Sequence, residues 1–160
     1  MVSGGYILLM RKLAFIVVLL VGCQADTYKV VGIADGDTIR ILKDNKEVRI
    51  RLAEIDCPER RQAFYEQAKQ FTAEKVFGKN VKINVIKESD RYGRVVAEVI
   101  LPDGSSLNEE LIKAGLAWHY KQFSKSKKLA ELEKEARENK QGLWSDPNAE
   151  PPWEFRKNRR

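Results

Sequence analysis

The stretch 48–59 constrains the fold of this chain more than any other segment of the sequence. In its first half three apolar residues alternate with two arginines, in the order Val48, Arg49, Ile50, Arg51 and Leu52. This period of two is typical of a half-buried β-strand. The strand ends before Pro58, because proline lacks an amide proton and favours an extended conformation in the residue before it. The sequence therefore predicts a strand that runs into a turn at a sheet edge.

The same stretch carries three charged side chains to that edge. Arg51 lies on the strand, Asp56 at its end, and Glu59 just after the proline. A guanidinium beside two carboxylates suits phosphate and metal ions better than it suits packing. The alternative interpretation of residues 56–59 is structural, as a helix N-terminus with Pro and Glu in its first turn.

The rest of the chain predicts one domain, since 160 residues leave room for a single sizeable core. Apolar periodicity indicates further strands at 28–34, 38–43, 81–86 and 94–101, and helices at 62–77, 106–115 and 127–139. Turns at 35–37 and 44–45 join the first three strands into an antiparallel meander. Five strands with a helix between the third and fourth match the order of an OB-fold barrel, an α+β architecture that often binds oligonucleotides.

Local signals mark two of the helices. Ser106 followed by Glu109 has the capping-box pattern, and Gly115 fits the position just after the helix that they open. In the last helix Glu133 and Arg137 have the i, i+4 spacing of an ion pair on the outer face.

The N-terminus is expected to be a targeting segment rather than part of the fold. Residues 1–22 combine two basic residues with a nine-residue apolar run, and they lead to Cys23 in a sequence that resembles a bacterial lipobox. We expect Cys23 to carry lipid and residues 24–27 to form a tether, which makes the protein extracytoplasmic and anchored at the cell envelope. A plain secretory signal is the alternative. Cys57 would then be the only thiol left, so the fold must stand without an intrachain disulfide.

The composition of the chain limits which partners it can bind and which catalytic groups it can use. The net charge is +6, or +4 without residues 1–22, which permits a polyanionic partner but also fits ordinary solubility charge. A single histidine excludes a nuclease built on a histidine pair. The sequence also has no Cys/His spacing for zinc and no phosphate-binding P-loop. Carboxylates and arginines remain as the candidate catalytic and ligand-binding groups.

These groups suit the cleavage of a phosphodiester. If the first strands are neighbours, Asp37 after the first turn and Asp56 converge, and such hard oxygen ligands favour Ca²⁺ or Mg²⁺. Arg51 and Arg94 are candidates for a bidentate phosphate clamp. Glu59 is the candidate general base for an attacking water.

Several separated motifs resemble the staphylococcal nuclease (thermonuclease) family. They are residues 33–38 (IADGDT), 49–52 (RIRL), 55–59 (IDCPE), 90–94 (DRYGR), 107–109 (LNE), 115–117 (GLA) and 142–144 (GLW). The resemblance covers residues 28 to 144, and we expect a nuclease domain over 28–146 followed by a proline-rich and basic tail over 147–160. It implies an OB-fold with three helices and Ca²⁺-dependent hydrolysis of DNA and RNA that leaves 3′-phosphate ends.

The resemblance also implies the ligands of the site. Asp37, Asp56 and the main-chain carbonyl of Cys57 match the ligands of one Ca²⁺ ion. Tyr92 matches a residue near the terminal phosphate, and Tyr120 one that packs by the base or sugar.

In the same way, Arg51 and Arg94 match the two catalytic arginines, and Glu59 the general base. The loop after Glu59 is shorter than in the family. We expect a monomer without an obligate protein partner. The competing hypothesis is a non-catalytic OB-fold module that binds nucleic acid or protein, but this chain keeps all five charged residues of the family site.

Overall fold

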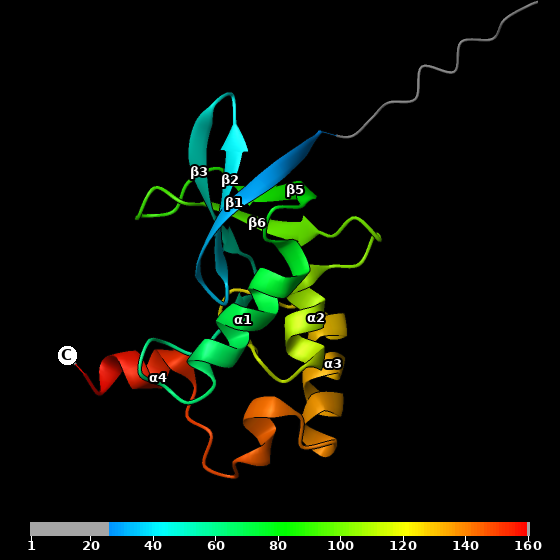
Figure 1. The fold of residues 1–160 in the computed structure, drawn as a ribbon. Coiled ribbons are helices and arrows are strands. Elements are labelled where there is room, and N and C mark those ends of the chain that lie inside the picture. Colours follow the sequence, from blue (N-terminus) through cyan, green and yellow to red (C-terminus); the bar gives the residue numbers. More distant parts are fainter. Residues whose placement is uncertain (1–25, 160) are drawn as a thin grey trace, which may run out of the picture.

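A computed structural model describes residues 26–159 of the chain (Figure 1). The expected signal segment and Cys23 lie outside the described residues. Within residues 26–159, no helix has both the length and the apolar character needed to cross a bilayer.

The framework of the structure is a closed barrel in the order β1-β2-β3-β6-β5. Its strands are β1 (Thr27–Asp35), β2 (Thr38–Lys43), β3 (Lys46–Leu52), β5 (Asn80–Lys87) and β6 (Val95–Ile100). β3 and β6 pair in parallel, while the remaining neighbours are antiparallel. The expected five-stranded α+β barrel is therefore confirmed.

Helices lie on one side of this barrel in Figure 1. The three expected helices are α1 (Tyr65–Val76), α2 (Leu107–Lys113) and α3 (Lys127–Glu138). A 3₁₀ turn, η1 (Gly142–Ser145), follows α3, and the short strands β4 (Ile55–Asp56) and β7 (Trp118–His119) form a second, two-stranded sheet. Sequence reasoning missed a fourth helix, α4 (Pro152–Lys157), because six residues are too short to show a helical period.

The alternation of β3 decides which of its side chains fill the barrel. Ile50 and Leu52 are only 1% exposed, and they pack with residues of β1, β2, β5 and β6 in one continuous core. The side chains between them point away from that core, as the period of a strand requires. The residues that build the barrel thus also fix the side on which Arg51 lies.

The capping box expected at α2 is not formed. The Ser106 side chain makes no capping hydrogen bond, and its hydroxyl is buried without a partner among the described residues. Glu109 instead forms an ion pair with Lys128 of α3 at 2.6 Å. This contact joins α2 to α3 and draws the carboxylate away from the cap.

Gly115 ends α2 as expected, and its replacement tests how tightly the chain turns there. Its φ is +64°, and a Cβ would lie 2.1 Å from the carbonyl oxygen of Gln141. Gly115→Ala is therefore expected to lower the free energy of unfolding by about 2–4 kcal/mol, measured by denaturant unfolding. Gly104→Ala is the control, because Gly104 also has positive φ but a Cβ there meets open space. Equal losses in both variants would show that the Gln141 contact is immaterial.

Candidate functional site

The end of the β1–β2 hairpin positions the first candidate ligand, Asp37. The Cys57 amide donates to Asp37 Oδ2 at 2.8 Å, and the Thr38 hydroxyl donates to Oδ1 at 3.2 Å. The Leu52 amide donates to the Asp37 carbonyl at 2.8 Å. Asp37 is 6% exposed, and its carboxylate is held by one main-chain amide and one hydroxyl, while the Leu52 amide fixes its backbone.

Arg51 joins the two candidate metal ligands. Its Nη2 lies 3.1 Å from Asp37 Oδ2 and 2.8 Å from Asp56 Oδ1, and its Nη1 donates to the Leu52 carbonyl at 2.5 Å. Burial disfavours the charged guanidinium, but Asp37 and Asp56 outweigh burial and raise the pKa of Arg51 above its usual value. The structure thus brings Asp37, Asp56 and Arg51 together, as the strand pattern suggested.

A residue that sequence reasoning missed, Arg156 of α4, completes this cluster. Its Nη2 lies 2.8 Å from Asp56 Oδ2, and its Nη1 lies 2.5 Å from Glu59 Oε1. Both Asp56 oxygens therefore face guanidinium groups, one from Arg51 and one from Arg156. Burial raises the pKa of the Asp56 carboxyl, and the hydrogen bond from Arg156 opposes that rise. Arg156 lies 100 residues from Asp56 in the chain, and no local pattern signals the contact.

Arg94 lies beside β3 but makes a separate contact. It precedes Val95, which pairs with Ile50 across the parallel β3–β6 ladder. Its guanidinium is held by Asp90, at 2.9 Å from Nε and 2.8 Å from Nη2. Among the described residues, no hydrogen bond or ion pair links Arg94 to the Asp37 and Asp56 carboxylates. The structure therefore places Arg51 on β3 and Arg94 just before the adjacent strand β6, without bringing both to one acceptor.

The turn that carries Arg94 is well ordered by its own hydrogen bonds. Asp90 accepts from the amides of Tyr92 at 2.8 Å and Arg94 at 3.0 Å. Slight burial works against the Asp90 carboxylate, but these bonds and the Arg94 side chain lower the pKa of Asp90 to about 2. Tyr92 is 55% exposed and its ring lies 5.2 Å from the Arg94 guanidinium, so it is open to a ligand beside that arginine.

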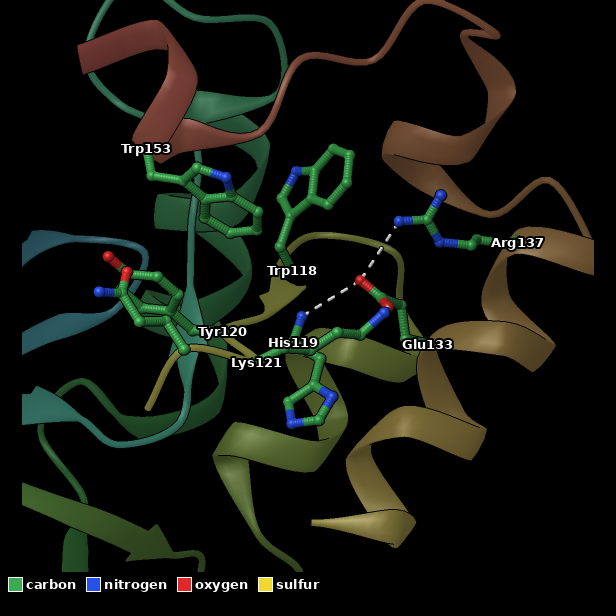
Figure 2. Close-up of a pocket in the computed structure, with 8 residues that line it drawn as sticks. Trp118, His119, Tyr120, Lys121, Glu133, Arg137 and Trp153 are labelled. Atoms are coloured by element: carbon green, nitrogen blue, oxygen red, sulfur yellow. Dashed lines mark hydrogen bonds and ion pairs between the residues drawn. The ribbon is translucent and has the colours of Figure 1, made fainter. Parts of the chain in front are cut away.

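Tyr120 occupies a different place, beside a cavity of about 220 Å³ (Figure 2). Its ring stacks on Trp153 of α4, with centroids 5.1 Å apart and planes inclined by 2°. Trp153 also meets Trp118 edge to face at 5.7 Å. One of the two faces of the Tyr120 ring is therefore covered by α4 and is not open to a base.

Glu133 lies under this cavity, and its position corrects the expected outer-face pair with Arg137. Glu133 is 3% exposed and accepts from the His119 amide at 3.3 Å, as Figure 2 shows. It also pairs with Lys121 at 3.1 Å and Arg137 at 3.4 Å. A buried carboxylate with these partners ties β7 to α3. His119 is itself buried, with Nε2 2.8 Å from the Ser124 hydroxyl.

The chemistry of the donors fits a hard cation. Asp37 and Asp56 offer carboxylate oxygens on the two sides of one guanidinium nitrogen, the class of ligand that Ca²⁺ prefers. Residues 26–159 contain no group of three or more acidic, histidine or cysteine side chains that could hold an ion. Main-chain carbonyl, water or substrate oxygens must supply the other ligands. Burial raises the pKa of the Cys57 thiol well above its usual value, so only the backbone of Cys57 is suited to this role.

Comparison with known proteins identifies the family of this chain. The family model described as staphylococcal nuclease homologue matches residues 49–146. The chain belongs to the staphylococcal nuclease family. A micrococcal nuclease of Shigella flexneri is 41% identical over 161 residues, covering 92% of each chain. An uncharacterized endonuclease of Escherichia coli is 41% identical over 80% of this chain and 83% of its own length. Staphylococcal-like nuclease CAN1 of Arabidopsis thaliana is 44% identical over 72% of this chain and 35% of its own.

Membership of the staphylococcal nuclease family confirms the predicted enzyme class, a nuclease hydrolase. The family match includes Arg51, Asp56, Glu59 and Arg94, but it ends before α4. The contact of Arg156 with Asp56 and Glu59 therefore lies outside what the family model describes.

The carboxyl of Asp35 lies two residues before Asp37, and it makes the stability of the cation-free protein depend on pH. Burial first, and then the charge of Asp37, raise the pKa of Asp35 from 3.8 to about 7. The folded state therefore keeps a proton that the unfolded chain releases, so stability falls as the pH rises from about 4 to 7. Asp35→Asn removes this titration and keeps an acceptor for the Asp37 amide, which donates to Asp35 Oδ1 at 3.3 Å.

The test is thermal unfolding in the presence of chelator. Between pH 4 and pH 8, the free energy of unfolding of wild type is expected to fall by on the order of 2–4 kcal/mol more than that of Asp35→Asn. The chelator is required because a bound cation would favour the ionised carboxyl. Parallel pH profiles for the two proteins would contradict the assignment.

Proposed function

We propose that this nuclease is a Ca²⁺-dependent endonuclease that hydrolyses DNA and RNA to leave 3′-phosphate ends. The observation that carries the proposal is Arg51, which lies between the buried carboxylates of Asp37 and Asp56. Two oxygen ligands and a guanidinium within hydrogen-bond reach of each other combine a cation site with a phosphate site. The two nuclease-named relatives from Shigella and Arabidopsis support the reaction class.

In this proposal the chain's own groups have separate tasks. Asp37, Asp56 and the Cys57 carbonyl would hold Ca²⁺, which would supply positive charge to the phosphate. Arg51 and Arg94 bind the phosphate and stabilise the charge that develops on it. Glu59 accepts a proton from the attacking water. Arg156 now pairs with Glu59, so its guanidinium must leave that carboxylate before Glu59 acts as a base.

The test is incubation of residues 24–160 with single-stranded DNA or RNA, with Ca²⁺ or with excess chelator. We expect short fragments with 3′-phosphate ends in Ca²⁺ and none in chelator, because the phosphate site then lacks its cation. Release of phosphate by a 3′-specific phosphatase, together with a free 5′-hydroxyl that polynucleotide kinase can label, distinguishes 3′-phosphate from 5′-phosphate ends. Binding without fragment release under both conditions would favour the non-catalytic OB-fold module.

We further propose that Cys23 carries a lipid and holds the nuclease at the bacterial cell envelope outside the cytoplasm. The support is the short apolar run that precedes this cysteine. Cys23→Ser is expected to move the protein from the membrane fraction to the soluble extracytoplasmic fraction. Continued membrane retention of the variant would count against the anchor.

A further inference from the structure

A second cavity lies between the loop after β4 and helix α4. Its volume is about 350 Å³, and its lining residues are Glu59, Arg60, Arg61, Phe155, Arg156 and Arg159. One wall comes from the loop that leads to α1, and the other from the C-terminal helix. Two segments about 95 residues apart in the sequence thus place four arginines around one space.

The charge of this cavity is strongly positive. Its one carboxylate, Glu59, is already paired with Arg156 at 2.5 Å. Arg60, Arg61 and Arg159 take part in no ion pair among residues 26–159. Three guanidinium groups without an acidic partner favour an anion with several oxygens, and phosphate suits their planar, bidentate geometry.

An aromatic ring lies among these charges. The guanidinium of Arg159 lies 4.1 Å from the centre of the Phe155 ring. Aromatic rings beside arginines are typical of grooves for single-stranded nucleic acid, because bases stack on the ring while phosphates meet the cations. The combination favours a nucleotide of a strand over an isolated inorganic ion.

The loop wall turns sharply at Arg61, whose φ is +74°. Its guanidinium lines the cavity and forms no ion pair among residues 26–159.

Glu59 connects this cavity to the catalytic cluster. It lines the cavity, and through Arg156 it is linked to Asp56. A strand whose scissile phosphate lies at Arg51 can therefore pass its neighbouring nucleotide into the cavity.

We propose that this arginine cavity binds a phosphate of the single-stranded DNA or RNA substrate next to the bond that is cleaved. The inference rests on the proposed nuclease function and adds to it a binding subsite built by α4. The subsite lies partly outside the family match, which ends at residue 146.

The test measures binding without cleavage, using residues 24–160 with chelator and a fluorescein-labelled oligothymidylate of 12 nucleotides. Anisotropy titrations at several NaCl concentrations give the affinity and its salt dependence. R61Q/R159Q is compared with the control K113Q/K157Q, which removes the same charge from exposed lysines that pair elsewhere, with Glu110 and Glu154. We expect roughly tenfold weaker binding for R61Q/R159Q and a salt slope smaller by about 1.4, since each single-strand phosphate contact contributes about 0.7.

Other results would overturn the proposal. An affinity and slope equal to those of the lysine control would show that the cavity makes no phosphate contact, and weaker binding with an unchanged slope would indicate a structural effect. R60Q/R159Q replaces the first variant if circular dichroism shows that R61Q/R159Q is unfolded. A loss confined to vesicles of phosphatidylglycerol, with oligothymidylate binding intact, would assign the cavity to lipid headgroups. Because the assay contains chelator, the subsite stands or falls independently of cleavage.

Discussion

Arg94→Ala is expected to lower the rate of phosphodiester hydrolysis by about 10³–10⁵-fold, the range measured for arginines that stabilise the charge of a transferred phosphoryl group. Arg94 is 24% exposed in its side chain and contacts Asp90 alone among the acidic residues described. Its guanidinium is therefore available to a substrate phosphate beside β3. The loss should appear in kcat at saturating Ca²⁺ and single-stranded DNA, while the thermal unfolding curve stays close to that of wild type.

Arg91→Ala provides the matched control for this prediction. Arg91 belongs to the same turn and also lies over the Tyr92 ring, at 4.8 Å, but its side chain forms no ion pair within residues 26–159. The control should retain its rate within a few-fold. A similar result for Arg94→Ala would remove Arg94 from the site, and an equal loss in both variants would point to the turn itself.

The second large effect concerns Arg156 and the cation. Arg156→Gln is expected to tighten Ca²⁺ binding by about 10–100-fold, because a guanidinium hydrogen-bonded to a carboxylate contributes about 1.5–3 kcal/mol that the cation must replace. Arg156 and the cation compete for the same carboxylate, since Arg156 faces both oxygens of Asp56 at 2.8 and 3.4 Å. Isothermal calorimetry of Ca²⁺ binding without substrate measures it directly.

Lys157→Gln is the control for this experiment. Lys157 follows Arg156 on α4 but pairs with Glu154 at 2.8 Å, away from the candidate ligands. It should bind Ca²⁺ with the affinity of wild type. Unchanged or weaker binding in Arg156→Gln would mean that the guanidinium does not compete with the cation but helps to hold the site together.

The sequence allowed the barrel to be predicted because its signals are local. Alternation in residues 48–52 predicts which side chains of β3 face the core, and the structure places Ile50 and Leu52 there. The turn residues Asp44 and Asn45 both have positive φ, as a tight hairpin requires. These features depend on a few neighbouring residues, so a single sequence is enough to recognise them.

The parts that could not be predicted depend on contacts between distant residues. Glu133 has the spacing of an exposed helix pair, yet β7 covers it and Lys121 joins its partners. Arg156 lies in a basic tail whose composition resembles a solvated end, and tertiary contacts such as the packing of Trp153 on Tyr120 determine where α4 lies. Neither position leaves a periodic signal, because each is fixed by the tertiary structure alone.

The division of the site between two sheets makes activity a reporter of complete folding. Asp37 and Arg51 belong to the closed barrel, whereas Asp56 lies on β4, which pairs with β7 in a separate sheet. The partner strand β7 comes 62 residues later in the chain and is fastened to α3 through Glu133. A fragment limited to the five barrel strands would thus lose the position of Asp56 and, with it, the Cys57 amide that holds the Asp37 carboxylate. The smallest catalytic unit of this protein must therefore extend through α3, well beyond the smallest unit that can close a barrel.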